Sequence, residues 1–395
     1  MASPKTRYLV FFQYFGSKYS GVMETSTDQS VIGVQNYMEK AAQNLKPVVP
    51  IKFHISSRTD TGVHALCNSA HLDIQRATGK PPFHERELVC SLNYHLKSEP
   101  IRVLSAYRVA NSFHARFSAL SRTYVYRLLM GCTHHSEIPV FERDLCWAPG
   151  GGYLNVPAMQ DAAWFLLGTH DFSTFRSLNS ETPFRSPVRT ILQVDIRPSS
   201  GFLSHHYEYR GLEFWELEFK SRSFLYRQVR RMVGALVAVG QGKLTPRHIK
   251  ELLEIKDSRA FPPHAMAPPS GLFLKSVEYN EAATLLSICL YQAQKFEPQI
   301  SSDLTLEICI ALAVNHLRDE VNPRTQGPHE VKAAQGTYPM LAIPTVLLQE
   351  KWQIFSGLRK CPMRQLPMPV QNSAWKQTSS IPSLLSSTAL SLCWD

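Results

Sequence analysis

The chain has 395 residues, of which 44% are hydrophobic, so it can build one large domain or two to three ordinary ones, and wholesale disorder is excluded. Lys and Arg total 42 against 32 Asp and Glu. Residues 281–395 carry nine basic and nine acidic side chains, so the whole surplus of ten lies in residues 1–280. A positive charge confined to one region favours a polyanionic partner such as nucleic acid. No apolar run approaches the roughly 20 residues that span a bilayer, so we expect no membrane contact.

Hydrophobic periodicity predicts strands and helices in two successive groups. The first group comprises strands at 7–14, 52–56, 65–74, 101–109 and 122–130 and a helix at 31–46. The second comprises helices at 156–167 and 223–239, strands at 190–196, 212–220 and 271–279, and a helix that starts at Thr245-Pro246. Because the strands and helices do not alternate strictly, this order predicts an α+β fold on a largely antiparallel sheet.

The segment with the clearest chemical potential is Arg58-Thr59-Asp60-Thr61-Gly62-Val63-His64-Ala65. Taken alone, Asp60-Thr61-Gly62 is typical of a tight turn. The same triplet is found in aspartic proteases, where two carboxylates share a proton, but this chain has no second copy. A homodimer would supply one, so the protease alternative stays open at this point.

Two further segments combine basic and aromatic residues. Residues 111–118 run into 121–127, a pattern typical either of a basic strand with aromatic core residues or of an RNA-binding face. Residues 223–234 are typical of an amphipathic helix with a solvated basic face. The His pairs at 134–135 and 205–206 lack companions at ligand spacing, and there is no Gly-rich phosphate loop, so we predict neither a metal nor a cofactor.

Together these segments resemble the TruA family of tRNA pseudouridine synthases. The shared motifs, in the family's order, are Arg-Thr-Asp-x-Gly-Val-His at 58–64, Phe-His-Ala-Arg-Phe-Ser at 113–118, Ser-Arg-x-Tyr-x-Tyr at 121–126, Gly-Thr-His-Asp-Phe-Ser-x-Phe-Arg at 168–176, Ser-Pro-Val-Arg-Thr-Ile at 186–191, Phe-x-x-x-x-Val-Arg-x-x-Val-Gly at 224–234 and Gly-Leu-Phe-Leu at 271–274. The resemblance covers about 5–280. It implies a pseudouridine synthase fold, with a largely antiparallel mixed sheet in two RRM-like halves and flanking helices.

The resemblance also divides the chain. Residues 1–118 are expected to form the N-terminal half with the nucleophile, and residues 119–280 the C-terminal half. After about residue 281 the Ser, Thr, Pro and Gln content rises, and only a short helix at 305–317 is predicted. The family has no counterpart for 281–395, so we predict an atypical, poorly ordered tail there.

Matching the motifs residue by residue implies an active site. The family nucleophile matches Asp60, and the Arg that displaces the target base matches Arg58. The Tyr that stacks on the uracil matches Tyr124, the Arg that pairs with the nucleophile and lowers its pKa matches Arg230, and the apolar residue beneath the base resembles Leu272. Further substrate contacts are expected from Arg116, Arg176, Arg189 and His64.

The resemblance implies isomerisation of uridine to pseudouridine in tRNA, in the anticodon arm, with messenger or mitochondrial RNA as alternative substrates. Because nothing is oxidised or reduced, no cofactor is expected. The family acts as homodimers, and the nearest resemblance within it implies a mitochondrial location, with the cytoplasm or nucleus as alternatives. A non-catalytic RNA-binding relative with the same fold is the second hypothesis. Thr61 stands where the family commonly has Ala, and a small residue still fits there. Gly21-Val22-Met23 stands where the family has Gly-Trp-Gln, a segment that helps to bind tRNA in the family, which leaves the choice of target open.

Overall fold

The computed structural model describes residues 5–178, 186–199 and 211–280, which all belong to one compact unit, Met1–Pro323. The helix predicted at 305–317 and the rest of the tail at 281–395 lie outside the described residues.

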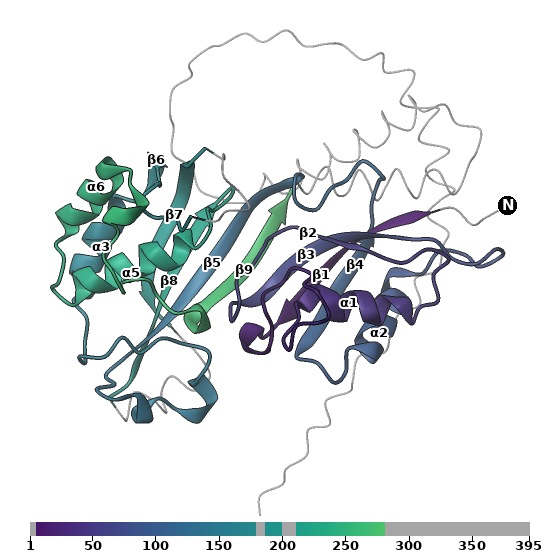
Figure 1. Ribbon diagram of the computed structural model, residues 1–395, viewed down its shortest axis with the longest axis horizontal. Helices are drawn as coiled ribbons and strands as arrows, with labels where there is room; N and C mark the ends of the chain where they lie inside the picture. The colour runs from purple at the N-terminus through teal and green to yellow at the C-terminus, as the bar shows by residue number, and fades with distance from the viewer. Residues whose placement is uncertain (1–4, 179–185, 200–210, 281–395) are drawn as a thin grey trace, which may run out of the picture. The chain divides into compact units, whose positions relative to one another are not determined.

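Nine strands form a single mixed sheet in the order β4-β1-β3-β9-β5-β8-β7-β6, with β2 paired to β3 (Figure 1). Among the pairings of these described strands, β3 and β9 run parallel and all others are antiparallel. The predicted fold class and sheet type are therefore confirmed. The strands are β1 (Thr6–Tyr14), β2 (Phe53–Ile55), β3 (His64–Ile74), β4 (Ile101–Arg108), β5 (Ala119–Met130), β6 (Gly168–Asp171), β7 (Val188–Pro198), β8 (Glu213–Ser221) and β9 (Leu272–Tyr279).

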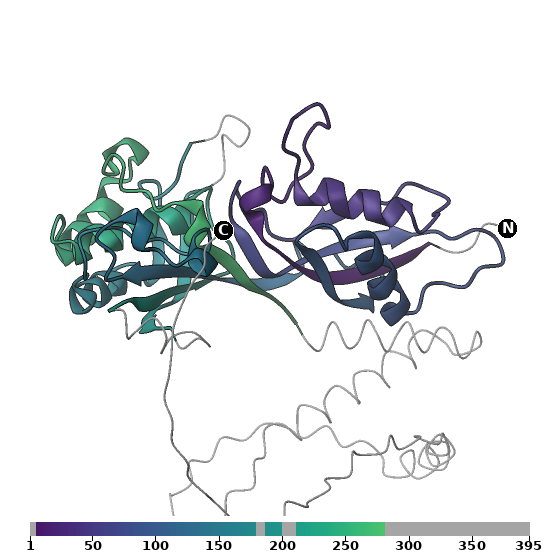
Figure 2. The same ribbon diagram turned by 90° about the horizontal axis from the view of Figure 1, so that it is seen from below.

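Helices pack on the sheet in both halves, and in Figure 2 the purple α1 and the green helices lie on the same side of the strands. The described α-helices are α1 (Val34–Gln43), α2 (Glu85–His95), α3 (Val156–Trp164), α5 (Gln228–Gly240) and α6 (Pro246–Ile255). The predicted start of α6 is confirmed, since Thr245 is its N-cap and Pro246 its first residue. No helix in the described part of the chain has both the length and the apolar character needed to cross a membrane.

Three differences from the predicted elements have local causes. Helix α5 begins at Gln228 rather than near residue 223, because Arg227 adopts a left-handed conformation (φ 58°) that a right-handed helix does not tolerate. Hydrophobic periodicity does not predict α2, because its buried stripe consists of only Leu88 and Leu92. Nor does it predict β6, which has four residues and is too short to show a period.

One hydrophobic cluster of buried side chains runs through both halves of the fold. Tyr8 and Phe12 on β1 and Leu72 on β3 are completely buried in it, as are Tyr126 on β5 and Phe219 on β8. Burial of large apolar side chains supplies the main stabilisation of such a core. The two halves are therefore joined by packing as well as by the continuous sheet.

Three neighbouring strands in the middle of the sheet bring the predicted site residues together. Strand β3 begins at His64, just after the turn that contains Asp60, and β9 begins at Leu272. The neighbour of β9 on the other side is β5, on which Tyr124 pairs with Leu274. The turn, the start of β9 and the middle of β5 therefore converge on one place.

Truncation of the core on β3 tests this architecture. Leu72 is fully buried, so Leu72→Ala should lower the free energy of unfolding by about 2–5 kcal/mol, through lost transfer energy and the cavity left behind. Leu66 lies on the same strand but is 46% exposed, so Leu66→Ala should change it by less than about 0.5 kcal/mol. Urea denaturation measures both, and equal losses would contradict the assigned facing of β3.

Candidate active site

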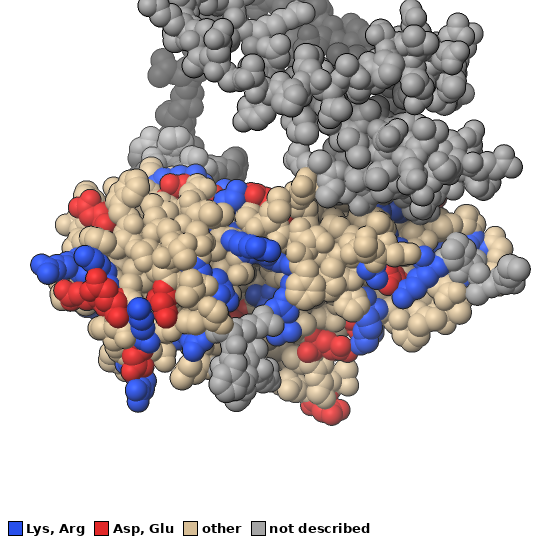
Figure 3. Space-filling view, turned by 90° about the horizontal axis from the view of Figure 1, so that it is seen from above, with Lys and Arg blue, Asp and Glu red and all other residues tan. Residues whose placement is uncertain are grey.

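A cleft of about 950 Å³ contains nearly all of the predicted site residues. Asp60 is the only acidic residue among its lining residues. The lining includes eight arginines: Arg58, Arg116, Arg122, Arg176, Arg189, Arg222, Arg227 and Arg230. On the face drawn in Figure 3, Lys and Arg side chains gather along the middle. A cleft lined by one sign of charge concentrates ligands of the opposite sign, in this case anions.

The turn that presents Asp60 is held by its backbone. Val63 donates its N–H to the Asp60 carbonyl at 3.1 Å, and Val22 donates to the Thr59 carbonyl at 3.3 Å. Gly62 has φ 78°, a conformation that favours glycine. A Cβ on Gly21 would lie 2.8 Å from the Thr59 carbonyl oxygen, so this close approach also requires glycine.

Side-chain hydrogen bonds beneath the turn fix it further. The Tyr14 and Thr59 hydroxyls lie 2.8 Å apart, and Asn68 Nδ2 donates to the Ser57 carbonyl at 2.9 Å. Burial raises the pKa of Tyr14 to about 12, so its hydroxyl stays neutral at physiological pH. This polar network is buried and satisfied, which gives the turn a single conformation.

Arg122 acts as a brace between three segments that line the cleft. It is buried, and its guanidinium donates to Ser57 Oγ at 3.3 Å, to the Arg116 carbonyl at 2.8 Å and to the Arg222 carbonyl at 2.8 Å. The hydrogen-bond donors of Arg122 are therefore used within the protein.

Asp60 faces Arg230 across the cleft. Asp60 Oδ2 lies 3.4 Å from Arg230 Nη1, and the two side chains are 24% and 9% exposed. Burial raises the pKa of Asp60 above its usual value and outweighs the charges of Arg230 and Arg227, which both lower it. The predicted effect of Arg230, which is to lower the pKa of Asp60, is therefore confirmed for that residue's own contribution, but desolvation reverses the net direction of the shift.

The basic residues of α5 are held by the protein rather than by solvent. Arg230 donates from Nε to the Ala267 carbonyl at 2.8 Å, and Arg231 donates from Nη1 to the Thr174 carbonyl at 2.9 Å. Arg227 stands in the left-handed region with its guanidinium 4.7 Å from the centre of the Tyr226 ring. The interpretation of this helix as one with a solvated basic face is therefore wrong for Arg230, which is 7% exposed.

Apolar groups form the rest of the site. Tyr124 is 8% exposed and its ring meets the Phe224 ring edge-on, with centroids 5.3 Å apart. Burial raises the pKa of the Tyr124 phenol, with Tyr14 and Asp60 adding to the shift, so the phenol stays protonated. Leu272 lines the same cleft. A flat ring and an aliphatic side chain beside an ionisable carboxylate suit a planar, uncharged group.

Arg58 differs from the other arginines. It is exposed, it lines the cleft, and it makes no hydrogen bond or ion pair with any residue that the structure describes. Its guanidinium is therefore available to a ligand. The remaining residues expected to contact substrate divide into two groups, since Arg116, Arg176 and Arg189 line the cleft and His64 does not.

His64 is buried beneath the turn. It accepts the Gly16 N–H at Nδ1 (3.0 Å), and its Nε2 lies 3.0 Å from the Asp144 carbonyl and 3.1 Å from the Ser270 carbonyl. Its ring stacks on Phe273, with centroids 4.6 Å apart. This position gives His64 a supporting role for the turn and for the loop before β9. The predicted substrate contact of His64 does not fit this position, because His64 does not line the cleft.

The residue that faces Asp60 bears on whether the Asp60-Thr61-Gly62 triplet belongs to an aspartic protease or to a TruA-like site. An aspartic protease needs a second carboxylate that shares a proton with the first. Asp60 instead faces a guanidinium, and the other lining residues of the cleft include no carboxylate. Within one copy of the chain, the cleft therefore lacks the pair of carboxylates that an aspartic protease needs. Arg222 and Arg227 also line the cleft but are not predicted from the sequence, because single arginines in a basic segment carry no spacing signal.

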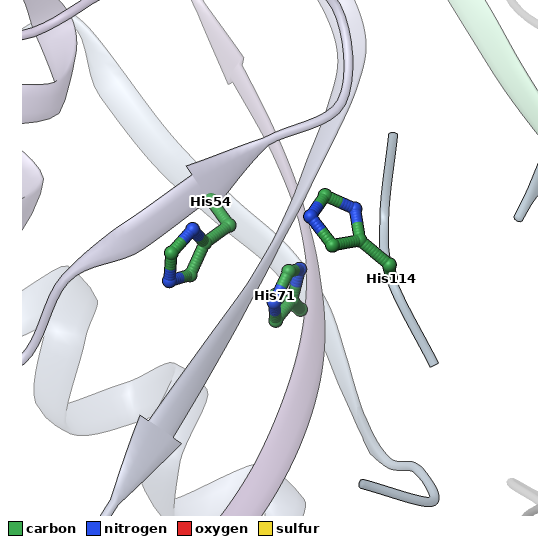
Figure 4. A group of neighbouring side chains, drawn as sticks. All are labelled: His54, His71 and His114. Carbon is green, nitrogen blue, oxygen red and sulfur yellow. The ribbon is translucent and has the colours of Figure 1, made fainter. Parts of the chain in front are cut away.

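A cluster of three histidines lies outside the cleft. His54 on β2, His71 on β3 and His114 on the loop before β5 place ring nitrogens within 4.8 Å of one another (Figure 4). Ala115 donates its N–H to Nδ1 of His71 and Arg116 donates to Nδ1 of His114, both at 3.2 Å. In a neutral ring the other nitrogen then carries the proton, so two of the three rings have no free lone pair for a metal. Motif spacing does not predict this cluster, because its members are far apart in the chain.

The balance of burial and charge at Asp60 can be measured. We expect its pKa to lie above 3.8 and to rise further in Arg230→Met, because that change removes the larger of the two charges that lower it. Arg227→Met should raise it less. NMR titration of protein with 13C-labelled aspartate reports each value, with Arg247→Met on the distant surface of α6 as the control. A wild-type pKa below 3.8, or no change in Arg230→Met, would contradict this account.

Comparison with known proteins agrees with the geometry. Residues 162–280 match a family model described as tRNA pseudouridine synthase. The chain is 60% identical over 301 residues to tRNA pseudouridine synthase-like 1 of Xenopus laevis, which covers 76% of this chain and 100% of that protein. It is 51% identical over 295 residues to the Homo sapiens protein of the same name (74% and 96%) and 37% identical over 275 residues to tRNA pseudouridine synthase A of Maricaulis maris (69% and 98%). The chain therefore belongs to the TruA family of tRNA pseudouridine synthases, and it is an isomerase.

Proposed function

We propose that this protein converts uridine to pseudouridine in tRNA, in the anticodon arm, with Asp60 as the nucleophile. The observation that carries the proposal is the pairing of Asp60 with Arg230 at 3.4 Å in an arginine-lined cleft that also contains Tyr124. The family to which the chain belongs supports the reaction and the substrate.

The reaction is a rearrangement in which atoms and electrons balance within the substrate. The bond between the sugar C1′ and uracil N1 breaks, and a bond between C1′ and uracil C5 forms. C5 loses its proton and N1 gains one, so no electron donor or acceptor takes part. The Asp60 carboxylate attacks the sugar carbon as the base departs and leaves again when C5 attacks.

The carboxylate must be ionised to act. Burial of Asp60 works against ionisation, and the nearby charges of Arg230 and Arg227 work in favour of it. Partial desolvation also makes a carboxylate more reactive, because fewer water molecules must leave before it attacks. Arg230 is thus assigned a positioning and electrostatic role.

The target base must leave its stack before it can reach Asp60. Flipping costs a few kcal/mol. Arg58 is exposed and makes no hydrogen bond or ion pair with the residues that the structure describes, so it can fill the space that the base vacates. The Tyr124 ring would stack on the flipped uracil, and Leu272 would pack against it.

On the resemblance alone we also propose that the protein acts as a homodimer and is located in mitochondria. Cytoplasmic or nuclear location, and messenger or mitochondrial RNA as further substrates, remain the alternatives.

The nucleophile is tested by substitution. We expect wild-type protein to form pseudouridine in the anticodon arm of unmodified tRNA, and Asp60→Ala to lose at least roughly a thousandfold in rate, as removal of a nucleophile does. Chemical mapping of pseudouridine measures both. Asp60→Ala should keep its RNA affinity, whereas its melting temperature should fall, because the substitution leaves the buried Arg230 guanidinium without its partner. RNA binding without product from the wild-type protein would favour the non-catalytic RNA-binding relative instead.

The arginines of the cleft should make binding depend on salt. Each phosphate contact that is removed lowers the slope of log affinity against log salt by about 1. Arg189→Gln should show this change, because Arg189 lines the cleft. Arg247→Gln should not, because the Arg247 side chain is 85% exposed on α6 and pairs with Glu251. Filter binding of tRNA across a salt series measures the slopes, and equal slopes for the two variants would argue against the cleft as the RNA site.

A further inference from the structure

A second pocket, of about 340 Å³, adjoins the cleft. Four residues line both: Met23, Arg58, Arg116 and Phe117. The rest of the second pocket is formed by Gln35, Lys52, Phe53, His54, Ile55 and His114. We call it the side pocket. Because Arg58 belongs to both, a chain that entered the cleft could place its neighbouring residue in the side pocket.

Phe117 is the most unusual side chain of the side pocket. It is 72% exposed, although phenyl groups are normally buried. Its ring centroid lies 4.4 Å from that of His114 and 5.8 Å from the Arg116 guanidinium. An exposed aromatic ring flanked by arginine and histidine is the combination on which proteins stack single-stranded bases.

The loop that carries Phe117 is ordered before any ligand arrives. Ser118 donates its N–H to the His114 carbonyl at 2.8 Å, and the Tyr279 hydroxyl donates to the Ala115 carbonyl at 2.7 Å. Arg122 donates to the Arg116 carbonyl at 2.8 Å. Because the backbone of the loop is held in this way, the loop loses little backbone entropy when a base stacks on the Phe117 ring.

The charges of the side pocket limit what it can hold. Lys52 lies 2.7 Å from Glu24 and 2.8 Å from Glu39, so its charge is largely compensated. Burial and the neighbouring His54 lower the pKa of His71 to about 3, and burial also lowers the pKa of His114. His71 and His114, which are drawn in Figure 4, are therefore neutral at physiological pH. Arg58 and Arg116 are the other cations that line the side pocket, which suits one phosphate and one uncharged base.

We propose that the side pocket binds a nucleotide next to the target uridine, with its base stacked on Phe117 and its phosphate near Arg58 and Arg116. This inference rests on the proposed function, since it assumes that an RNA strand enters the cleft. It assigns the segment 113–118 a role in recognising the sequence or shape around the target, separate from the chemistry at Asp60. Met23, Phe53 and Ile55 give the pocket apolar walls that favour a base over a second phosphate.

The test combines protein and RNA changes. Phe117→Ala removes the stacking ring. Two RNA stem-loops remove the base: one has an abasic site on the 5′ side of the target uridine, and the other has an abasic site on the 3′ side. We expect Phe117→Ala to raise the Kd for intact RNA roughly 5- to 150-fold, the range for loss of one stacked base. On RNA abasic at one flanking position the same substitution should have no effect. Phe117→Trp should restore binding, since it keeps a flat ring.

Phe141→Ala is the matched control, because Phe141 is 78% exposed and does not line either pocket. All variants should keep the wild-type melting temperature. An unchanged Kd for Phe117→Ala, or an equal loss on every abasic RNA, would overturn the side pocket while leaving the proposed reaction standing. Wild-type protein that forms no pseudouridine in tRNA would overturn the proposed reaction. Tight binding of zinc to the full chain that is lost in His114→Ala would overturn the nucleotide assignment in favour of a metal.

Discussion

The ion pair between Asp60 and Arg230 joins two parts of the chain that are 170 residues apart, and the architecture of the cleft follows from the need to hold it. Charges removed from water are costly unless they are paired and anchored. Arg230 is anchored by the Ala267 carbonyl. Asp60 is anchored by a turn whose backbone bonds to Val22 and Val63. Loss of either anchor would leave a partly buried charge without its partner.

The sheet makes this pairing possible. The turn before β3 belongs to the first half of the fold, whereas α5 belongs to the second. Strand β9, the last described strand, lies between β3 and β5 and pairs with both. This return of the chain to the middle of the sheet places Leu272 beside the turn and Tyr124. Arg122 then connects the turn to the loop before β5, through the Arg116 carbonyl, and to the loop after β8, through the Arg222 carbonyl.

The cleft concentrates positive charge around one carboxylate, and this arrangement has a cost in stability. Arg227 occupies a left-handed conformation, and burial disfavours both the Asp60 carboxylate and the Arg230 guanidinium in their charged forms. Strain and desolvation of this kind are concentrated at functional sites, and the rest of the fold must compensate for them. The continuous core through both halves, with residues such as Tyr8 and Tyr126 fully buried, supplies that compensation.

The sequence by itself determined the fold class, most of the strands and the identity of Asp60, Arg58, Tyr124 and Arg230 as candidates, because these depend on local periodicity and on motifs that are contiguous in the chain. Only the tertiary structure decided how burial and charge balance at Asp60, because desolvation depends on everything packed around a group. It also decided that His64 supports the turn from beneath and that His54, His71 and His114 meet. The side pocket around Phe117 is likewise visible only in the tertiary structure, because its walls come from segments that are far apart in the chain.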